Sequence, residues 1–242
     1  MKTAGTVFAR HLQQQFPGEQ FYPSRGFDWQ TDTDLEPYIS VPRLLRIPDE
    51  RRAQIRVYSG HFPFIAAELL EPDLRLITIL RDPVDRTVSV LKHFKRLDAE
   101  FHHAPLESIY DNESIARRHI LNYQTKIFSM VESDKADVVQ RPVAIDDARL
   151  ELAQANLERV EFVGLTEQFG AFIEELRARL GWWPAGIDAN DRANKSPEAW
   201  SVTPELRERI ARDNPYDMAF YRFAKELVTR RRAPPGGAEA PA

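Results

Sequence analysis

The sequence predicts an α/β protein of three layers, in which a mostly parallel sheet is flanked by helices. Short β-branched runs alternate along the chain with stretches of helical periodicity, which is typical of strand–helix–strand units. The clearest run is 74–80, with Leu or Ile at five of its positions, and a second is 160–165. Such continuous apolar runs are typical of strands covered on both faces. Strands joined through helices pair in parallel, so the alternation predicts a largely parallel sheet.

The length of 242 residues suits one sizeable domain, which we place at residues 1–230. Residues 231–242 are rich in Pro, Gly and Ala and lack apolar periodicity, so we expect a disordered tail there. We find no sequence pattern that predicts the oligomeric state.

The net charge of -4 argues against binding to nucleic acid or to an anionic membrane. There is no cysteine, which excludes disulfides and thiolate metal sites, and we expect no resident metal. We find no apolar run long enough for a transmembrane segment and no signal peptide, which predicts a soluble, cytoplasmic protein of bacterial type.

The N-terminal segment Met1-Lys-Thr-Ala-Gly-Thr6 is a loop of small residues that leads into a helical pattern. Backbone amides at the start of a helix can hold an anion, and the helix dipole favours negative charge there. Lys2 would add a mobile positive charge beside the amides of Thr3, Ala4, Gly5 and Thr6. An inert chain end is the alternative.

A strand is predicted at 55–58, followed by Gly60, His61 and a helix over 64–70. His61 would then lie at the carboxyl end of a strand, where open α/β sheets bind ligands. An imidazole with a pKa of about 6.5 can take a proton from a hydroxyl near neutral pH. The alternative is a histidine that only hydrogen-bonds the turn. Residues 13–43 are loop-rich, and their aromatic side chains either line an acceptor pocket or attach the loop to the core.

The strand at 74–80 leads into a helix, because Asp82 suits an N-cap and Pro83 the first helical position. We expect the apolar stripe of this helix to pack on the sheet. Ser89 lies close to two turns beyond Asp82, on the same helix face. Arg81 and Ser89 would therefore point into one crevice, where they suit a terminal phosphate. The alternative is an ion pair of Arg81 with Asp82 or Asp85.

Further helical patterns cover 107–127, 146–157, 167–180, 203–213 and 216–230. Thr166 suits the N-cap of the third of these helices. The polar loop 190–197 contains Lys195, whose ammonium could reach a phosphate.

Several of these segments resemble sulfotransferases that use 3′-phosphoadenosine 5′-phosphosulfate (PAPS). Arg81-Asp-Pro-Val-Asp-Arg-Thr-Val-Ser89 resembles their 3′-phosphate element, and Lys2 to Thr6 resembles their 5′-phosphosulfate loop. Gly60-His-Phe62 and Asn122-Tyr-Gln-Thr-Lys126 are similar to segments of the carbohydrate sulfotransferases that act on heparan sulfate at the 2-O and 6-O positions. With the helix at 214–227, the likeness runs in the family's order from Lys2 to about Arg230.

The resemblance implies a P-loop NTPase-like fold and transfer of a sulfuryl group from PAPS to a hydroxylated small molecule or glycan, without a metal. It implies His61 as catalytic base and Lys2 as a catalytic cation. The 3′-phosphate would be held by Arg81, Ser89 and Lys195, the 5′-phosphosulfate by the loop from Lys2 to Thr6, and the acceptor by His61, Asn122 and Gln124. In the family a hydrophobic strand precedes the loop, whereas Met1 stands here where proline is usual and the first strand is missing from the sequence. Either the true start lies upstream or the sheet lacks this strand.

Two other interpretations stay open. A small-molecule kinase would need a Walker A motif, and no Gly-Lys pair occurs in the sequence. A non-catalytic nucleotide-binding relative, inactive without its first strand, is the second. The identity of the acceptor is also open, because a fold does not fix a substrate.

Overall fold

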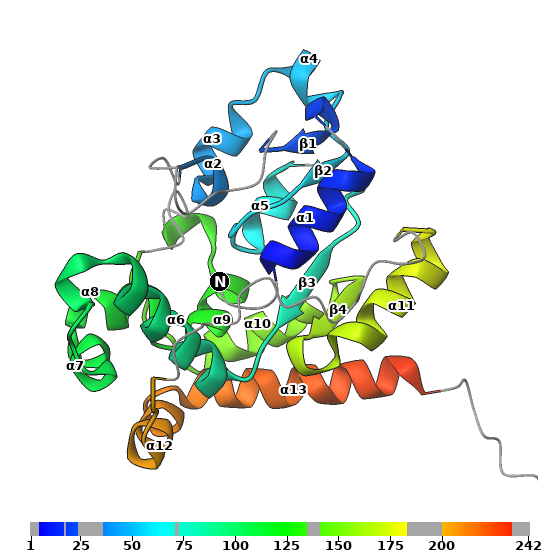
Figure 1. Ribbon diagram of the computed structural model, residues 1–242. Helices are drawn as coiled ribbons and strands as arrows, with labels where there is room; N and C mark the ends of the chain where they lie inside the picture. Colours follow the sequence, from blue (N-terminus) through cyan, green and yellow to red (C-terminus); the bar gives the residue numbers. More distant parts are fainter. Residues whose placement is uncertain are drawn as a thin grey trace, which may run out of the picture.

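The computed structural model describes residues 5–16, 18–23, 36–70, 73–134, 141–182 and 200–233. These residues form a mixed α/β structure that is mostly helical and contains small parallel sheets (Figure 1). The strands are β1 Phe21–Tyr22, β2 Val57–Tyr58, β3 Ile77–Leu80 and β4 Phe162–Leu165. The α-helices are α1 Gly5–Gln15, α2 Glu36–Ile39, α3 Val41–Leu45, α4 Asp49–Arg52, α5 Ile65–Leu70, α6 Pro83–Leu97, α7 Leu106–Asp111, α8 Glu113–Ile115, α9 Tyr123–Ser129, α10 Asp147–Glu158, α11 Phe169–Leu180, α12 Pro204–Asp213 and α13 Pro215–Arg232.

The strands pair in parallel, as the alternation of elements predicted. Phe21 lies opposite Val57 in the β1–β2 pair, and Ile77 lies opposite Phe162 in the β3–β4 pair. Among the described residues these two pairs remain separate, whereas the sequence predicted one sheet. Within the described ranges, β2 and β3 therefore each have a strand neighbour on one side only.

The turn from β3 into α6 forms as predicted. A carboxylate oxygen of Asp82 accepts hydrogen bonds from the backbone N–H of Val84 at 3.0 Å and of Asp85 at 3.1 Å, which caps the helix. Pro83 occupies the first turn. Backbone N–H groups there have no partner within the helix, so the helix loses no hydrogen bond to proline. The end of β3 and the start of α6 are thereby fixed relative to each other.

The apolar stripe of α6 packs differently from the prediction. Val84, Val88 and Leu91 are buried in a cluster with α7 and α12, which contribute Leu106, Ile109, Leu206 and Ile210. The helix therefore packs against other helices with this stripe, while the sheet is covered by other elements.

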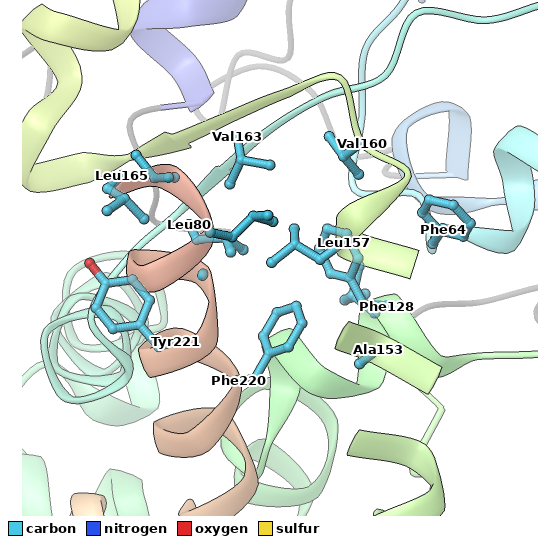
Figure 2. Close-up of a cluster of buried hydrophobic side chains, with 14 of the residues drawn as sticks. Phe64, Leu80, Phe128, Ala153, Leu157, Val160, Val163, Leu165, Phe220 and Tyr221 are labelled. Atoms are coloured by element: carbon cyan, nitrogen blue, oxygen red, sulfur yellow. The ribbon is translucent and has the colours of Figure 1, made fainter. Parts of the chain in front are cut away.

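The largest hydrophobic cluster joins β3 and β4 to helices α9, α10 and α13 (Figure 2). Leu80 and Val163 come from the strands, and Phe128, Leu157 and Phe220 come from the three helices. Full burial of each such side chain contributes about 1.5–3 kcal/mol. A second cluster, which includes Leu12, Phe21, Phe162 and Phe172, connects α1 and β1 to the same strand pair through α11.

Two predicted boundaries are wrong, and one predicted helical region is divided. Residues 107–127 are mostly helical as predicted, but the helix is interrupted at Asn112 and again before α9, where Asn122 adopts a left-handed conformation with φ 45°. Asparagine tolerates this conformation better than most residues. Thr166 does not cap α11; its hydroxyl donates instead to the carbonyl of Leu80 at 2.9 Å, and α11 begins at Phe169. α13 continues to Arg232, two residues into the predicted tail.

None of the helices formed by the described residues is both long and apolar enough to cross a membrane.

Gly164 is required by the packing of α11 on β4. A Cβ atom at this position would lie 2.8 Å from the ring of the fully buried Phe172. We expect Gly164→Ala to lower the free energy of unfolding by about 1–3 kcal/mol, the usual cost of overpacking. Urea denaturation measures this loss. Gly5→Ala is the matched control, because its added methyl meets nothing within 4 Å and alanine favours a helix. Equal stability of Gly164→Ala and wild type would contradict the packing.

Candidate functional site

The candidate site is built around the turn between β3 and α6, which we call the β3–α6 corner (residues 81–89). Arg81 follows directly on β3, and its peptide groups are held by the side chain of Gln124. The Gln124 Oε1 accepts from the Arg81 N–H at 3.1 Å, and its Nε2 donates to the Arg81 carbonyl at 2.9 Å. The backbone of Arg81 is therefore fixed, while its side chain is half-buried.

The acidic residues beside Arg81 have other partners. Asp82 caps α6, and a carboxylate oxygen of Asp85 accepts from the Arg207 guanidinium at 2.7 Å. Asp82 therefore caps α6, and Asp85 connects α6 to α12. Ser89, also half-buried, lies three residues beyond Arg86 and so on the same face of α6.

Arg86 is a residue of this corner that the sequence did not single out. It is only 1% exposed, and its guanidinium lies 4.1 Å from the centre of the Tyr123 ring. Its Nη2 donates to the carbonyl of His119 at 2.8 Å, whereas within the described part of the chain its Nε and Nη1 have no hydrogen-bond partner. In the sequence, the spacing of three residues between Arg86 and Ser89 was the pattern that could have placed Arg86 on the same helix face as Ser89.

A second buried cation, Lys126, lies 4.6 Å from the same Tyr123 ring. Its Nζ donates to the carbonyls of Arg118 at 2.9 Å and Arg141 at 3.3 Å. Burial lowers the pKa of the Lys126 ammonium to about 7, and the charge of Arg86 acts in the same direction. Arg86, Lys126 and Tyr123 form what we call the cationic cluster.

His119 borders the cationic cluster. Burial lowers the pKa of its imidazole to about 4, and the charges of Lys126 and Arg86 contribute to the same shift. At neutral pH His119 is therefore uncharged, whereas Arg86 carries a positive charge and Lys126, with a pKa of about 7, is about half protonated.

Asn122 and Gln124, the two predicted acceptor-binding amides, form structural hydrogen bonds. Asn122 Oδ1 accepts from the backbone N–H of Tyr216 and of Asp217, both at 3.1 Å. Gln124 uses both ends of its amide on Arg81 and is 1% exposed. Gln124 therefore positions the corner, whereas Asn122 holds the first turn of α13.

His61 lies in the turn after β2 and is half-buried. Its backbone N–H donates to the carbonyl of Tyr38 at 2.7 Å. Gly60 permits this close approach, because a Cβ there would lie 2.7 Å from the same carbonyl and 2.5 Å from the ring of Phe62. A glycine before His61 is thus a steric requirement of the turn.

His61 lines a cleft of about 920 Å³ that also contacts β2, β3, α1 and α5. Arg81 and Ser89 lie outside the lining of this cleft. The His61 segment and the β3–α6 corner are nevertheless both attached to α9, because the Phe64 N–H donates to the Ile127 carbonyl at 2.9 Å while Gln124 holds Arg81.

The remaining predicted residues are only partly within the described structure. Lys2, Thr3, Ala4 and Lys195 lie outside it. Gly5 begins α1 and lines the cleft, and Thr6 follows it in the helix backbone.

No family model, curated protein or solved structure matches this chain.

The cationic cluster predicts an unusual dependence of stability on pH. The pKa of Lys126 is about 7 in the folded protein against an ordinary 10.5, so the unfolded chain binds more protons between these values. Stability due to Lys126 should therefore rise with pH across this window, by up to about 1.4 kcal/mol per pH unit. Lys126→Met should lack this rise.

Urea denaturation at pH 7, 8 and 9 compares wild type with Lys126→Met. Lys225→Met, an exposed lysine of α13, is the control and should follow wild type. If the stability of Lys126→Met changes with pH in parallel with wild type, the amine is not buried as described.

Proposed function

We propose that the protein is a sulfotransferase that moves the sulfuryl group of PAPS to a hydroxyl of an acceptor. The β3–α6 corner is the observation that supports this proposal. Arg81 stands at the carboxyl end of a parallel strand, where open α/β sheets bind ligands. The helix that follows is capped by Asp82 and presents Ser89 two turns later. A guanidinium and a hydroxyl in this arrangement suit the 3′-phosphate that distinguishes PAPS from ATP-like nucleotides.

The cationic cluster supports the same assignment. Arg86 and Lys126 are each 1% exposed. Burial lowers the pKa of Arg86, and the charge of Arg81 adds a smaller effect in the same direction, so the corner and the cluster interact electrostatically. Positive charge in a low-dielectric interior is screened less than charge at the surface. The cluster therefore favours a strongly anionic ligand at the corner above it.

In the proposed reaction the acceptor oxygen attacks the sulfur in line with the bond to the 5′-phosphate. The new oxygen–sulfur bond forms as the sulfur–phosphate oxygen bond breaks, and adenosine 3′,5′-bisphosphate leaves. His61 accepts the proton of the acceptor hydroxyl. Lys2 and the amides of Thr3 to Thr6 would stabilise the charge that develops on the leaving phosphate, and Lys195 would add to the 3′-phosphate site.

The proposal includes a P-loop NTPase-like fold and a carbohydrate acceptor. The fold is supported by parallel strands alternating with helices. The carbohydrate is favoured only by the likeness of the His61 and Asn122 segments to enzymes that act on heparan sulfate.

Arg81→Ala and His61→Ala should separate cofactor binding from chemistry. Loss of the guanidinium removes charge-assisted hydrogen bonds worth about 1.5–3 kcal/mol, so Arg81→Ala should weaken binding of adenosine 3′,5′-bisphosphate by about 10- to 150-fold. His61→Ala should retain this affinity and, once an acceptor has been found by screening with labelled PAPS, lose about 10²- to 10⁴-fold in turnover. Titration calorimetry and the transfer assay measure the two effects.

Arg230→Ala is the control for both measurements, since Arg230 is an exposed arginine near the end of α13 that pairs with Glu158. Unchanged nucleotide affinity in Arg81→Ala would remove the 3′-phosphate site from the corner. Normal turnover in His61→Ala would show that another group is the base.

A further inference from the structure

The cleft lined by His61 has two zones of different polarity. Among the described residues that line it, the Asp and Arg side chains are all exposed: Arg56, Asp73 and Arg75. Every buried residue of the same lining is apolar, including Leu12, Ile79 and Phe128. The charged side chains therefore lie at the mouth of the cleft, and the apolar side chains form its interior.

The apolar interior is held in place by core packing. Phe8 and Leu12 of α1 belong to a hydrophobic cluster that also contains Ile79 of β3. Elsewhere in the lining, the ring centroids of Phe64 and Phe128 lie 6.1 Å apart. Because contacts within the protein fix these side chains, the interior is pre-formed, as in most sites for small molecules.

His61 lies between the two zones. The preceding Gly60 is exposed, whereas His61 and the following Phe62 are half-buried, and all three residues line the cleft. The backbone of this turn is held by the bond from the His61 N–H to the Tyr38 carbonyl at 2.7 Å. A ligand that places a hydroxyl beside His61 therefore has the apolar interior on one side and the charged mouth on the other.

The size and polarity of the cleft indicate the class of this ligand. Its volume of about 920 Å³ is at the upper end of the range for ligand pockets, roughly 300–1,000 Å³. Apolar cavities exclude water and bind apolar molecules. The hydroxyls of a free sugar would lose hydrogen bonds to water there without replacement, which is unfavourable. An alkyl chain or an aryl ring suits the interior, and a hydroxylated group suits the mouth.

We propose, on the basis of the sulfuryl transfer inferred above, that the cleft binds an amphipathic acceptor, an alkyl or aryl glycoside. Its apolar group occupies the interior between α1 and β3. Its sugar lies toward the mouth, with one hydroxyl beside His61.

Alkyl β-D-glucosides test this proposal by direct binding in the absence of PAPS. Titration calorimetry measures the affinities of glucose and of hexyl, heptyl and octyl glucoside, each below the concentration at which it forms micelles. Burial of each additional CH₂ group should tighten binding about fourfold. Glucose, which lacks an apolar group, should bind too weakly to measure.

Two substitutions on different helices block the cleft. Ala67→Trp on α5 and Ala9→Trp on α1 each add an indole to the lining, so both variants should bind octyl glucoside at least about tenfold more weakly than wild type. Ala148→Trp, at an exposed position of α10 outside the lining, is the matched control and should bind it like wild type. Circular dichroism verifies the folding of each variant.

Three results overturn the inference. Equal affinities across the alkyl series would mean that the chain is not buried. Unchanged binding by both blocked variants would place the glucoside outside the cleft. Absence of sulfated octyl glucoside in the presence of PAPS, although adenosine 3′,5′-bisphosphate binds, would mean that the ligand of the cleft is not the acceptor.

Failure of the proposed function gives a different result. If adenosine 3′,5′-bisphosphate does not bind, sulfuryl transfer is contradicted, whereas the binding of alkyl glucosides and its loss in the two blocked variants still establish the cleft as a glycoside site.

Discussion

A buried series of hydrogen bonds from α13 through α9 to β3 determines the position of the candidate site. Asp217 of α13 is 1% exposed and accepts from the backbone N–H of Gln124 at 3.1 Å and of Thr125 at 2.7 Å. Gln124 then holds both peptide groups of Arg81. Each bond contributes about 0.5–1.5 kcal/mol, but a buried group left without its partner costs more, so the series forms as a unit. The direction in which Arg81 leaves β3 depends on this unit.

The same arrangement brings Tyr123 between two buried cations. Aromatic rings stabilise ammonium and guanidinium groups at such distances, which partly offsets the cost of burying Arg86 and Lys126. The buried carboxylate of Asp217 acts electrostatically on both Arg86 and Lys126, while two N–H groups of Arg86 have no hydrogen-bond partner within the described residues.

Local signals in the sequence predicted the elements but not their assembly. The Asp82 cap, the Pro83 start and the β3 run depend on neighbouring residues, and the structure confirms them. The packing of α6 on α7 and α12 depends on residues far along the chain, so the stripe on α6 did not reveal its partner. Asn122 and Gln124 resembled ligand-binding amides because the sequence does not show that Asp217 and Arg81 lie beside them. The separation of the strand pairs likewise became visible only in three dimensions.

The central claim is that the β3–α6 corner recognises a 3′-phosphate, and the affinities of two nucleotides test it most directly. Titration calorimetry without magnesium compares adenosine 3′,5′-bisphosphate with adenosine 5′-monophosphate, which differ only in that group. The account predicts at least about tenfold tighter binding of the bisphosphate, since charge-assisted hydrogen bonds to phosphate are worth roughly 1.5–3 kcal/mol. Equal affinity for the two nucleotides would contradict it. Tight binding of ATP in the presence of magnesium, without tight binding of the bisphosphate, would contradict it as well.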